Sequence, residues 1–444
     1  MSSIIKVNTI QDAGGNTLAV SDGSGNITTN NFKDIQWQSV ITADGSTSTT
    51  AEAGKGYIID TSSNTHTINL PASPSAGDVV AVIQSGSNSV TVGRNGNNIL
   101  SGTFDKTLST NASVTFVYSS SASIGWVQQN NDVPDTFVSA TGGTETTSGN
   151  YKIHTFTSSG CFTVASTSSC ASNNDVSYMV VAGGAGGGGS DNGAKGGGGG
   201  AGGFREGKVS TDSYTASPLD AGSGITVTAT TYPITVGAGG AAGSGIPINP
   251  QSPDNGSNSV FSTITSTGGG KGATYDGNGA GPGGSGGGGA IGSGPIYTPA
   301  GSGNTPPVSP SQGSNGGTGT PYCGTNHASR ASAGGGGATA AGANGGNVNP
   351  VGGVGGAGAT TSISGSSTAY AGGGGGAGGT GLGGTGGTGG GGPGHTTYPG
   401  TGVAGTTNTG GGGGAAGVAT GGSPANLAGG AGGSGIVIIR YKYQ

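Results

Sequence analysis

Charged residues are scarce in this 444-residue sequence, at 7% of the total, whereas 108 residues are glycine. Soluble domains usually contain about 25% charged residues, so an ordinary enzyme fold over the whole chain is excluded. The formal net charge of −5 is too small to indicate a nucleic-acid partner. No apolar run reaches the ~18 residues of a membrane span, and the first residues lack the apolar core of a signal peptide. We therefore expect synthesis in a cytoplasm and no membrane insertion.

Cysteine is also scarce, with only Cys161, Cys170 and Cys323. Three thiols cannot form a complete disulfide framework or a four-ligand zinc site, although Cys161 and Cys170 could meet across one hairpin. No stretch has the 3.6-residue apolar period of an amphipathic helix. We therefore predict an all-β fold class with polyglycine II in its C-terminal part, and neither a metal nor a cofactor.

Glycine is concentrated in contiguous runs between Gly183 and Gly435. Collagen is excluded, because it needs glycine at every third position and more proline than the 19 residues present. A disordered linker and a bundle of polyglycine II helices remain as alternatives. A polyglycine II helix has about three residues per turn, and its backbone groups point outward, so they must bond to neighbouring helices. We predict the bundle, clamped by the apolar strands 178–182 and 436–439.

Four regions follow one another along the chain. Residues 1–33 contain short strands with too few apolar side chains for a core, which indicates an attachment or oligomerisation segment. Residues 34–130 have the turn spacing of a β-sandwich or barrel. Residues 131–182 are predicted to form a β-hairpin adaptor, and residues 183–444 the glycine-rich domain.

Alternating apolar residues define the core expected in the second region. His66, on one of these strands, is predicted to lie at the surface. The candidate core comprises Tyr57, Ile59, Ile68, Leu70, Val80, Val82, Phe116 and Trp126. In the adaptor, the alternating run 151–156 is expected to turn back and pair with 162–164 as a hairpin.

Motifs for catalysis are weak. Residues 180–189 match the G-x-G-x-x-G pattern, but no helical period follows, so a dinucleotide site is not expected. His154, His327 and His395 are isolated, and no nucleophile elbow is present. Carboxylates of the glycine region fall in loops, where solvated surface is the usual role: Glu206, Asp212, Asp220 and Asp254. We predict no catalytic and no metal-binding residues.

The inserts between the glycine runs carry most of the region's aromatic, histidine and charged residues. Tyrosine among small polar neighbours is a recurrent recognition composition, because its ring is large, rigid and polar at its tip. The alternative is that these aromatics cap or stack against the bundle. Inserts 290–333 and 393–399 are the preferred recognition surface, with candidate binding residues Tyr297, Tyr322, His327, Arg330, His395 and Tyr398.

The run Tyr178-Met179-Val180-Val181-Ala182-Gly183-Gly184 precedes the glycine runs, and Gly435-Ile436-Val437-Ile438-Ile439-Arg440-Tyr441 follows them. This combination resembles glycine-rich tail fibre proteins and distal adhesins of tailed bacteriophages, especially marine ones. The opening residues 5–12 look like the start of such fibres, and residues 56–60 with 70–78 resemble a β-module of their shafts.

The resemblance implies attachment to other virion tail or baseplate proteins through the N-terminus, and binding of a host cell-surface receptor by loops at the free end of the bundle. Fibres of this type are usually homotrimers. We therefore expect a non-enzymatic virion tail fibre, with a protein or polysaccharide receptor. The alternatives are a purely structural or ice-binding glycine-rich filament and, third, a surface-polysaccharide depolymerase.

Overall fold

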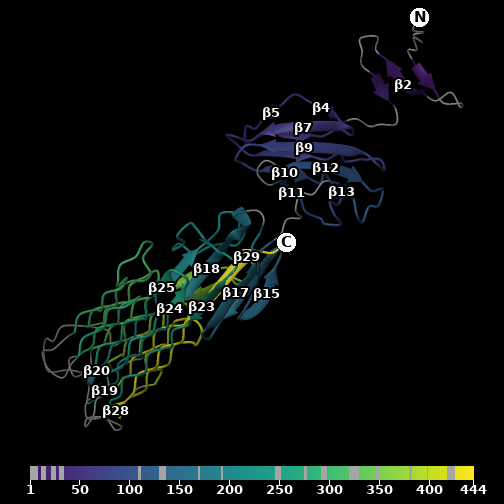
Figure 1. The fold of residues 1–444 in the computed structure, drawn as a ribbon. Helices are drawn as coiled ribbons and strands as arrows, with labels where there is room; N and C mark the ends of the chain where they lie inside the picture. Colours follow the sequence, from purple (N-terminus) through teal and green to yellow (C-terminus); the bar gives the residue numbers. More distant parts are fainter. Residues whose placement is uncertain are drawn as a thin grey trace, which may run out of the picture. The chain divides into compact units, whose positions relative to one another are not determined.

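The protein divides into two compact units, Met1–Asp135 and Thr136–Gln444 (Figure 1). The computed structural model describes residues 9–11, 17–21, 27–29, 35–108, 112–129, 137–168, 171–191, 194–245, 252–274, 278–291, 298–319, 330–346, 351–379, 383–397, 399–417 and 426–444. These residues form strands and extended segments, and their single helix is the short 3₁₀ turn η1 (Ala171–Asn174). The all-β prediction is confirmed. Within the described ranges, no helix has the length and apolar character needed to cross a membrane.

The first unit begins with a small antiparallel sheet in the order β1-β2-β3. Its strands are β1 (Thr9–Gln11), β2 (Thr17–Ser21) and β3 (Ile27–Thr29). Short strands were predicted here from the spacing of apolar residues and glycine turns.

Two further sheets of this unit share one hydrophobic core. The first is ordered β13-β12-β9-β7-β4, with β5 also on β7, and the second β11-β10-β8-β6. Their strands are β4 (Gln36–Trp37), β5 (Ile41–Thr42), β6 (Ser48–Thr50), β7 (Lys55–Asp60), β8 (His66–Asn69), β9 (Val79–Ser85), β10 (Val90–Gly93), β11 (Lys106–Leu108), β12 (Ser113–Tyr118) and β13 (Trp126–Gln128). Strands β6, β8 and β10 pair in parallel, as do β7 and β9, so the chain coils from one sheet to the other. All predicted core residues belong to this core.

The prediction for His66 was wrong, because its side chain is only 4% exposed. His66 shares the parity of Ile68 and Leu70, so the alternation of β8 turns all three inward. Its Nε2 lies 3.0 Å from Oγ1 of Thr49 on the neighbouring strand β6. Burial lowers the pKa of the imidazole.

The second unit is built on two sheets. The first is ordered β14-β17-β23-β24-β25, and the second β15-β16-β29-β18-β21, with β22 also on β18. Their strands are β14 (Ser139–Thr141), β15 (Thr144–Ser148), β16 (Tyr151–Phe156), β17 (Gly160–Ser166), β18 (Asp175–Val181), β21 (Phe204–Gly207), β22 (Ile225–Thr226), β23 (Thr231–Thr235), β24 (Ser259–Phe261), β25 (Ile264–Ser266) and β29 (Ile436–Lys442). The C-terminal strand β29 lies between β16 and β18 and pairs antiparallel with both. The prediction that the glycine domain begins and ends in one sheet is confirmed.

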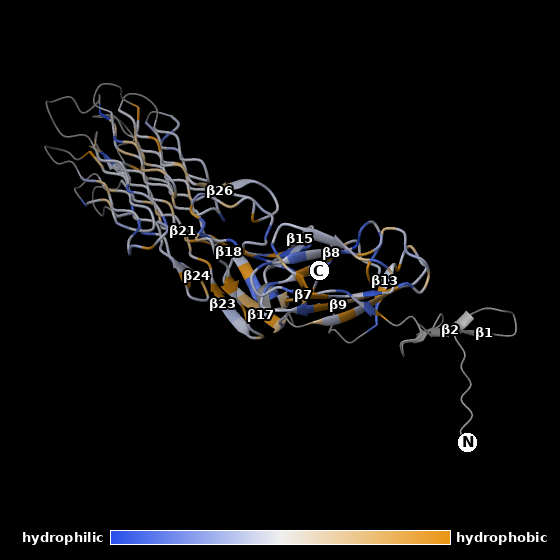
Figure 2. Ribbon diagram, turned by 90° about the horizontal axis from the view of Figure 1, so that it is seen from above, coloured by the Kyte–Doolittle hydropathy of each residue, from blue (hydrophilic) through white to orange (hydrophobic). Residues whose placement is uncertain are grey.

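Strands β18 and β29 are covered on both faces, as their continuous apolar runs predicted. Tyr178 and Val180 face a core shared with the first sheet, whereas Met179 and Val181 face a second apolar cluster on the opposite side. Figure 2 shows hydrophobic colour on β17, β18, β23 and β24, while the glycine segments are mostly pale.

The predicted hairpin of 151–156 with 162–164 is not formed. Strand β16 pairs with β15 and β29, whereas β17 pairs with β14 and β23 in the other sheet. Phe156 and Phe162 enter the same core from opposite sheets, so the residues between them cross from one layer to the next. Both strands belong to the same compact unit as the glycine segments.

The glycine bundle, which comprises the extended segments between Ala182 and Gly435, runs back and forth from these sheets (Figure 1). In the central segment 183–188, amides three residues apart donate to the same neighbour. These bonds, of 2.9–3.0 Å, run from Gly183 and Gly186 to Ser257 and Asp254, from Gly184 and Gly187 to Gly433 and Gly430, and from Ala185 and Gly188 to Gly200 and Gly197.

Carbonyl groups of the central segment follow the same three-residue repeat. They accept from Gly269 and Gly272, from Gly240 and Gly243, and from Gly413 and Ala416. Along 183–188, the residue numbers of the acceptors decrease, so the three acceptor segments run antiparallel to it. The residue numbers of the donors increase, so the three donor segments run parallel to it. The central segment is therefore surrounded by three antiparallel and three parallel neighbours, with its backbone groups bonded to all of them.

Candidate functional site

Three short strands close the far end of the glycine bundle, opposite the end that adjoins β18 and β29 (Figure 1). They are β19 (Ser190–Asp191), β20 (Ala194–Lys195) and β28 (Asn426–Leu427), in the order β20-β19-β28. Lys195 also bridges to Ile291, with backbone N–H···O bonds of 2.9 and 3.0 Å in the two directions. Segments distant in the sequence therefore meet here.

Lys195 is a buried charged residue of this end, with 0% of its surface exposed. Burial, together with the positive charge of Arg330, lowers the pKa of its ammonium group to about 8. Lys195 in turn acts electrostatically on the ring of His395. Arg330 and His395, two of the predicted binding residues, therefore lie close to one lysine.

His395 is held by backbone groups on both of its ring nitrogens. Nε2 accepts from the N–H of Gly378 at 2.9 Å, and Nδ1 lies 3.0 Å from the carbonyl oxygen of Thr397. This arrangement fits the neutral tautomer that carries its proton on Nδ1. Burial lowers the pKa of the imidazole, and the side chain is only 1% exposed. The ring also lies directly against Gly417, where a Cβ would collide with it.

Of the six predicted binding residues, the structure describes two. Arg330 and His395 are buried, at 5% and 1% exposure. Tyr297, Tyr322, His327 and Tyr398 lie outside the described residues. The positions that flank them are described: Ile291 bridges to Lys195, Thr298 Oγ1 accepts from the N–H of Ala290, and Gly319 lies against the Ala290 carbonyl.

The predicted insert 290–333 is not separate from the glycine bundle along its whole length. Residues 298–303 and 312–319 lie in the glycine bundle; for example, Gly301 donates to Gly287 at 2.9 Å and Gly316 to Gly301 at 3.1 Å. The sequence does indicate a bundle segment here, through glycine at every third position (Gly313, Gly316 and Gly319) instead of a contiguous glycine run. The short turn 304–311 between the two segments returns at the sheet end, where Phe204 donates to Gln312 at 2.8 Å.

Three aromatic residues of the inserts pack against the bundle. Phe204, Tyr214 and Tyr370 are 1%, 6% and 5% exposed and belong to the apolar cluster between the sheet and the glycine segments. For these residues the capping interpretation is correct. Tyr178 is buried and Tyr232 packs against the same core as β18, as predicted for both. Cys161 is a free, exposed thiol on β17, and Cys170 and Cys323 lie outside the described residues.

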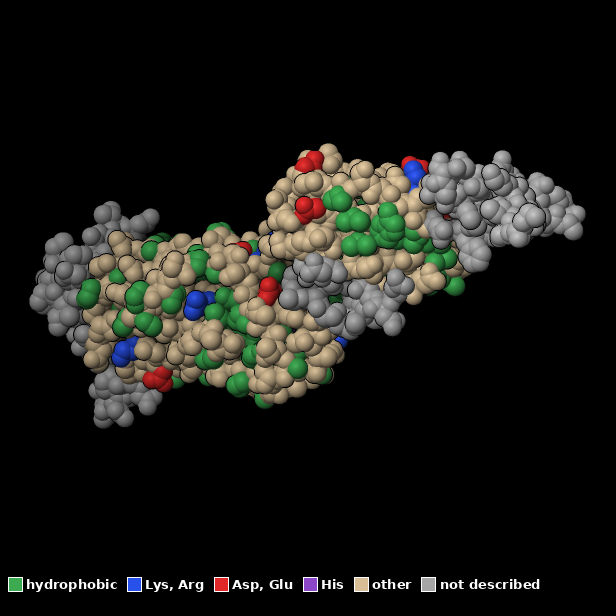
Figure 3. All heavy atoms as spheres, turned by 45° about the horizontal axis from the view of Figure 1, so that its top comes forward, with side chains coloured by type: hydrophobic (Ala, Val, Ile, Leu, Met, Phe, Trp, Pro, Cys, Tyr) green, Lys and Arg blue, Asp and Glu red, His purple; other side chains and the backbone are tan. Residues whose placement is uncertain are grey.

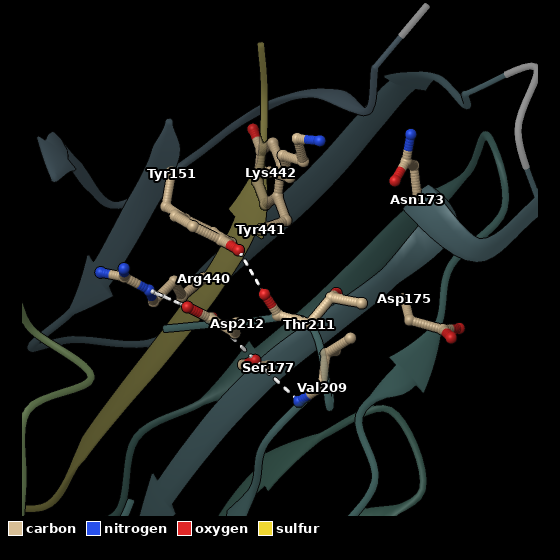
Figure 4. A pocket seen from close by; sticks show the side chains of 10 residues that line it. All are labelled: Tyr151, Asn173, Asp175, Ser177, Val209, Thr211, Asp212, Arg440, Tyr441 and Lys442. Atoms are coloured by element: carbon tan, nitrogen blue, oxygen red, sulfur yellow. Dashed lines mark hydrogen bonds and ion pairs between the residues drawn. The ribbon is translucent and has the colours of Figure 1, made fainter. Parts of the chain in front are cut away.

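A second polar cluster lies at the sheet end, around the ion pair of Arg440 and Asp212 (Figure 4). Nε of Arg440 donates to both carboxylate oxygens of Asp212, at 3.0 and 3.1 Å. Ser177 Oγ donates to the same carboxylate at 3.0 Å and accepts from the N–H of Val209, also at 3.0 Å. Both charged side chains are almost fully buried, at 3% and 2% exposure.

Aromatic rings enclose this ion pair. The guanidinium carbon of Arg440 lies 4.5 Å from the ring centroid of Tyr151 and 5.5 Å from that of Tyr214. Burial raises the pKa of both phenols. The space beside the cluster, about 10 Å³, holds at most one water molecule. This geometry indicates a structural clamp that joins β18, β29 and the loop after β21.

Carboxylates of the inserts also have structural partners. Glu206 accepts from the N–H of Ser217 at 2.8 Å and from the hydroxyl of Thr361. Asp220 accepts from the N–H of Lys208 at 2.8 Å. In the part of the chain that the structure describes, no group of three or more His, Cys, Asp or Glu side chains is arranged to hold a metal ion.

Two family models match the sequence. Residues 156–442 match the glycine-rich domain family, and residues 39–124 match the phage depolymerase C-terminal beta sandwich domain. A search of the curated proteins finds no match. The first match spans more than half of the chain, so this protein belongs to the glycine-rich domain family. Together the two matches point to a bacteriophage tail fibre-like protein and to a component of the virion.

Proposed function

We propose that this protein is a tail fibre adhesin that recognises a host cell-surface receptor through loops held by a polyglycine II scaffold. The scaffold is supported by the three-residue repeat of the bonds made by 183–188, which is the period of a polyglycine II helix. Glycine suits a segment with neighbours on every side, because a Cβ added at any glycine of 183–188 would collide with another backbone; Ala185 is the one residue of this segment that carries a Cβ.

One observation carries the receptor proposal: the bundle gathers the ends of both predicted recognition inserts around Lys195. Ile291 bridges to Lys195, and Arg330 and His395 act with it electrostatically. Short insert segments anchored on a rigid scaffold are a common design for binding, because little conformational freedom is lost when the partner binds. Arg330 and His395 are buried, so their role in this proposal is to hold the insert segments in place, and the proposed receptor contacts are Tyr297, Tyr322, His327 and Tyr398.

The proposal includes a homotrimer attached to the virion through the N-terminal segment. The strands of the sheet β1-β2-β3 have only three to five residues and carry few apolar side chains, which supports pairing with other chains. Several weak sites on one fibre would then add avidity without a tight single contact. The mass of the protein in solution tests this part, and a monomeric mass contradicts it.

Receptor recognition is tested by exchanging residues 292–297, 320–329 and 396–399 for Gly-Ser sequences of equal length, one segment at a time. We expect loss of host-cell binding by the purified protein, while thermal unfolding of the glycine bundle is unchanged. The control exchanges residues 305–309 at the opposite end. Unchanged binding in all three variants contradicts the proposal.

A polysaccharide depolymerase is the second candidate, because residues 39–124 match a domain family named for depolymerases. Asp212, Glu206 and Asp220 all have structural partners, which gives this candidate less support. Release of sugar from host surface extracts by the purified protein distinguishes the two. Binding without release supports the adhesin.

A further inference from the structure

We propose that β29 is the closing element of the glycine bundle, and that the bundle cannot assemble until β29 has been synthesised and has left the ribosome. The proposal concerns the order of folding and does not depend on what the protein binds.

The sheet at the base of the bundle is incomplete without β29. Strands β16 and β18 each pair with β29 and not with each other. Because adjacent strands lie about 4.8 Å apart, removing β29 leaves a slot of about 9.6 Å between them. The slot crosses both apolar clusters, since Val437, Ile439 and Tyr441 face one and Ile436 and Ile438 face the other.

The segment that leads into β29 completes the bundle itself. Gly184 and Gly187, in the central segment, donate to Gly433 and Gly430 at 2.9 Å. Residues 428–435 also donate to another segment of the bundle: Gly432 donates to Gly240 at 2.9 Å, and Gly429 donates to Gly243 at 3.0 Å. Segments 183–188 and 240–243 also bond directly to each other, but without residues 428–435 the N–H groups of Gly184 and Gly187 lose their acceptors and the carbonyl groups of Gly240 and Gly243 lose their donors.

Charge makes the same strand necessary. Asp212 is buried, and β29 supplies its cation, Arg440, at 3.0 Å. Tyr441 adds a hydrogen bond to the buried His154, with 3.0 Å between its hydroxyl and Nε2, and their rings stack at 5.5 Å. Before β29 arrives, the pocket around Asp212 has a carboxylate without its counter-ion, which opposes burial of the surrounding loop.

The first unit has no such requirement. Its sandwich strands, β4 to β13, pair only with each other within the described residues, and they enclose their own core. It is therefore expected to fold as soon as it leaves the ribosome, as N-terminal domains generally do. This unit provides an internal control within the same chain.

The test uses chains of residues 1–444 that are arrested on the ribosome by an arrest sequence fused after Gln444. A short linker after Gln444 keeps β29 in the exit tunnel, and a long linker releases it. Each complex is digested briefly with a protease of broad specificity. With the short linker we expect the sandwich fragment to survive and the glycine fragment to be lost; with the long linker we expect both to survive, as in the released protein.

Two variants of the long-linker chain test whether protection requires the packing of β29 or only a longer chain. Ile438→Asp places a charge in the apolar cluster and should remove the protected glycine fragment, whereas Gln444→Asp, beyond the strand, should leave it intact. A glycine fragment that is already protected with the short linker overturns the proposal. Sensitivity at every linker length, when the released chain is resistant, overturns it as well.

Discussion

At the residue scale, glycine is required where one backbone lies directly on another. A Cβ on Gly199 would be pressed against the carbonyl carbon and oxygen of Ala185, closer than any real Cβ contact. The amide of Gly199 donates to Gly413 at 2.8 Å, and its carbonyl accepts from Gly374 at 2.9 Å. The whole residue is therefore enclosed by main chain, which cannot move aside as a side chain would.

Replacing Gly199 by alanine should destabilise the second unit by about 2–3 kcal/mol, because the neighbouring segments must separate to admit the methyl group. Urea unfolding, monitored with a spectroscopic probe placed in the second unit, measures this change in stability. The matched control is Gly279→Ala, since a Cβ there would have nothing within 4 Å. Equal stability of the two variants would contradict the close packing described.

Histidine burial predicts the pH dependence of stability. His154 is fully buried, with Nδ1 2.7 Å from the Gly142 carbonyl oxygen and Nε2 3.0 Å from the Tyr441 hydroxyl, and burial lowers its pKa. The unfolded chain therefore takes up a proton at a higher pH than the folded one. Stability is complete above the ordinary histidine pKa and falls as the pH drops below it.

We expect the denaturation midpoint of the second unit to decrease as the pH is lowered from about 7 to about 5. Each buried histidine lowers the free energy of unfolding by at most about 1.4 kcal/mol per pH unit. Comparison of the wild-type protein with His154→Gln, at several pH values, checks this expectation. The variant should show a shallower slope. An identical slope would mean that His154 does not titrate differently on folding.

At the element scale, position in the bundle determines the glycine pattern of a segment. Central segments such as 196–200 are uninterrupted glycine, whereas outer segments such as 351–358 have two glycines followed by an outward residue. Val351 and Val354 of the outer segment are 47% and 46% exposed, while the glycines between them are buried. A repeat of three therefore needs glycine only at the positions that face other segments.

Outer segments also lack one neighbour, and asparagine takes its place. Oδ1 of Asn258 accepts from the N–H of Gly268 at 2.9 Å, and Oδ1 of Asn255 accepts from the N–H of Lys271 at 2.8 Å. The two asparagines are three residues apart, so both face the same adjoining segment. Side-chain oxygens thus replace the main-chain acceptors that a further segment would provide.

Asn258→Ala should lower the stability of the second unit by about 1 kcal/mol, because the N–H of Gly268 loses its acceptor. Asn258→Asp keeps the acceptor oxygen and should stay near wild type. Chemical denaturation of the two variants side by side makes the comparison. A loss of similar size in both would show that the side-chain oxygen has no such role.

The clamp between Arg440 and Asp212 joins elements that lie far apart in the sequence. Arg440→Met should destabilise the second unit by about 3–5 kcal/mol, because it leaves the Asp212 carboxylate buried without its cation. The double variant Arg440→Met/Asp212→Leu should recover most of that loss, since it removes both charges. Thermal unfolding of the single and double variants measures the coupling. If the double variant is no more stable than the single one, the ion pair is not the source of the effect.

Much of the element inventory could be predicted from the sequence, because apolar alternation determines which residues face a core. Ile68, Leu70, Val80 and Val82 are examples, and the runs at β18 and β29 correctly indicated strands covered on both faces. Strand partners could not be predicted in the same way. Alternation does not distinguish a hairpin from a crossover between sheets, which is why β16 and β17 were paired wrongly.

The candidate site was less accessible to sequence reasoning. Lys195, Arg330 and His395 come from different segments and act on one another electrostatically, and no local pattern in the sequence indicates that these segments meet. The clamp of Asp212 and Arg440 is likewise a contact across the whole glycine region. Residues of this kind can be recognised only after the paths of the segments are known.

At the scale of the whole molecule, the second unit is stabilised in two different ways. Its base is an ordinary apolar core, in which the rings of Phe162 and Phe261 meet edge to face at 6.2 Å. The bundle depends instead on main-chain hydrogen bonds, each with a small net contribution of about 0.5–1.5 kcal/mol. Charged side chains are sparse on the face in Figure 3, and the coloured part of this face shows no large patch of one sign.

Hydrogen–deuterium exchange of the central segment tests the hydrogen-bonded bundle most directly. The amides of residues 183–188 all donate to other segments, so they should exchange only when the bundle opens and rank among the slowest in the protein. The exposed residues 62–64 provide a fast reference within the same sample. Slow exchange in 183–188, far below that of a free peptide of the same sequence, is the predicted result. Exchange at the rate of the free peptide would contradict the scaffold and, with it, the proposed receptor-binding end.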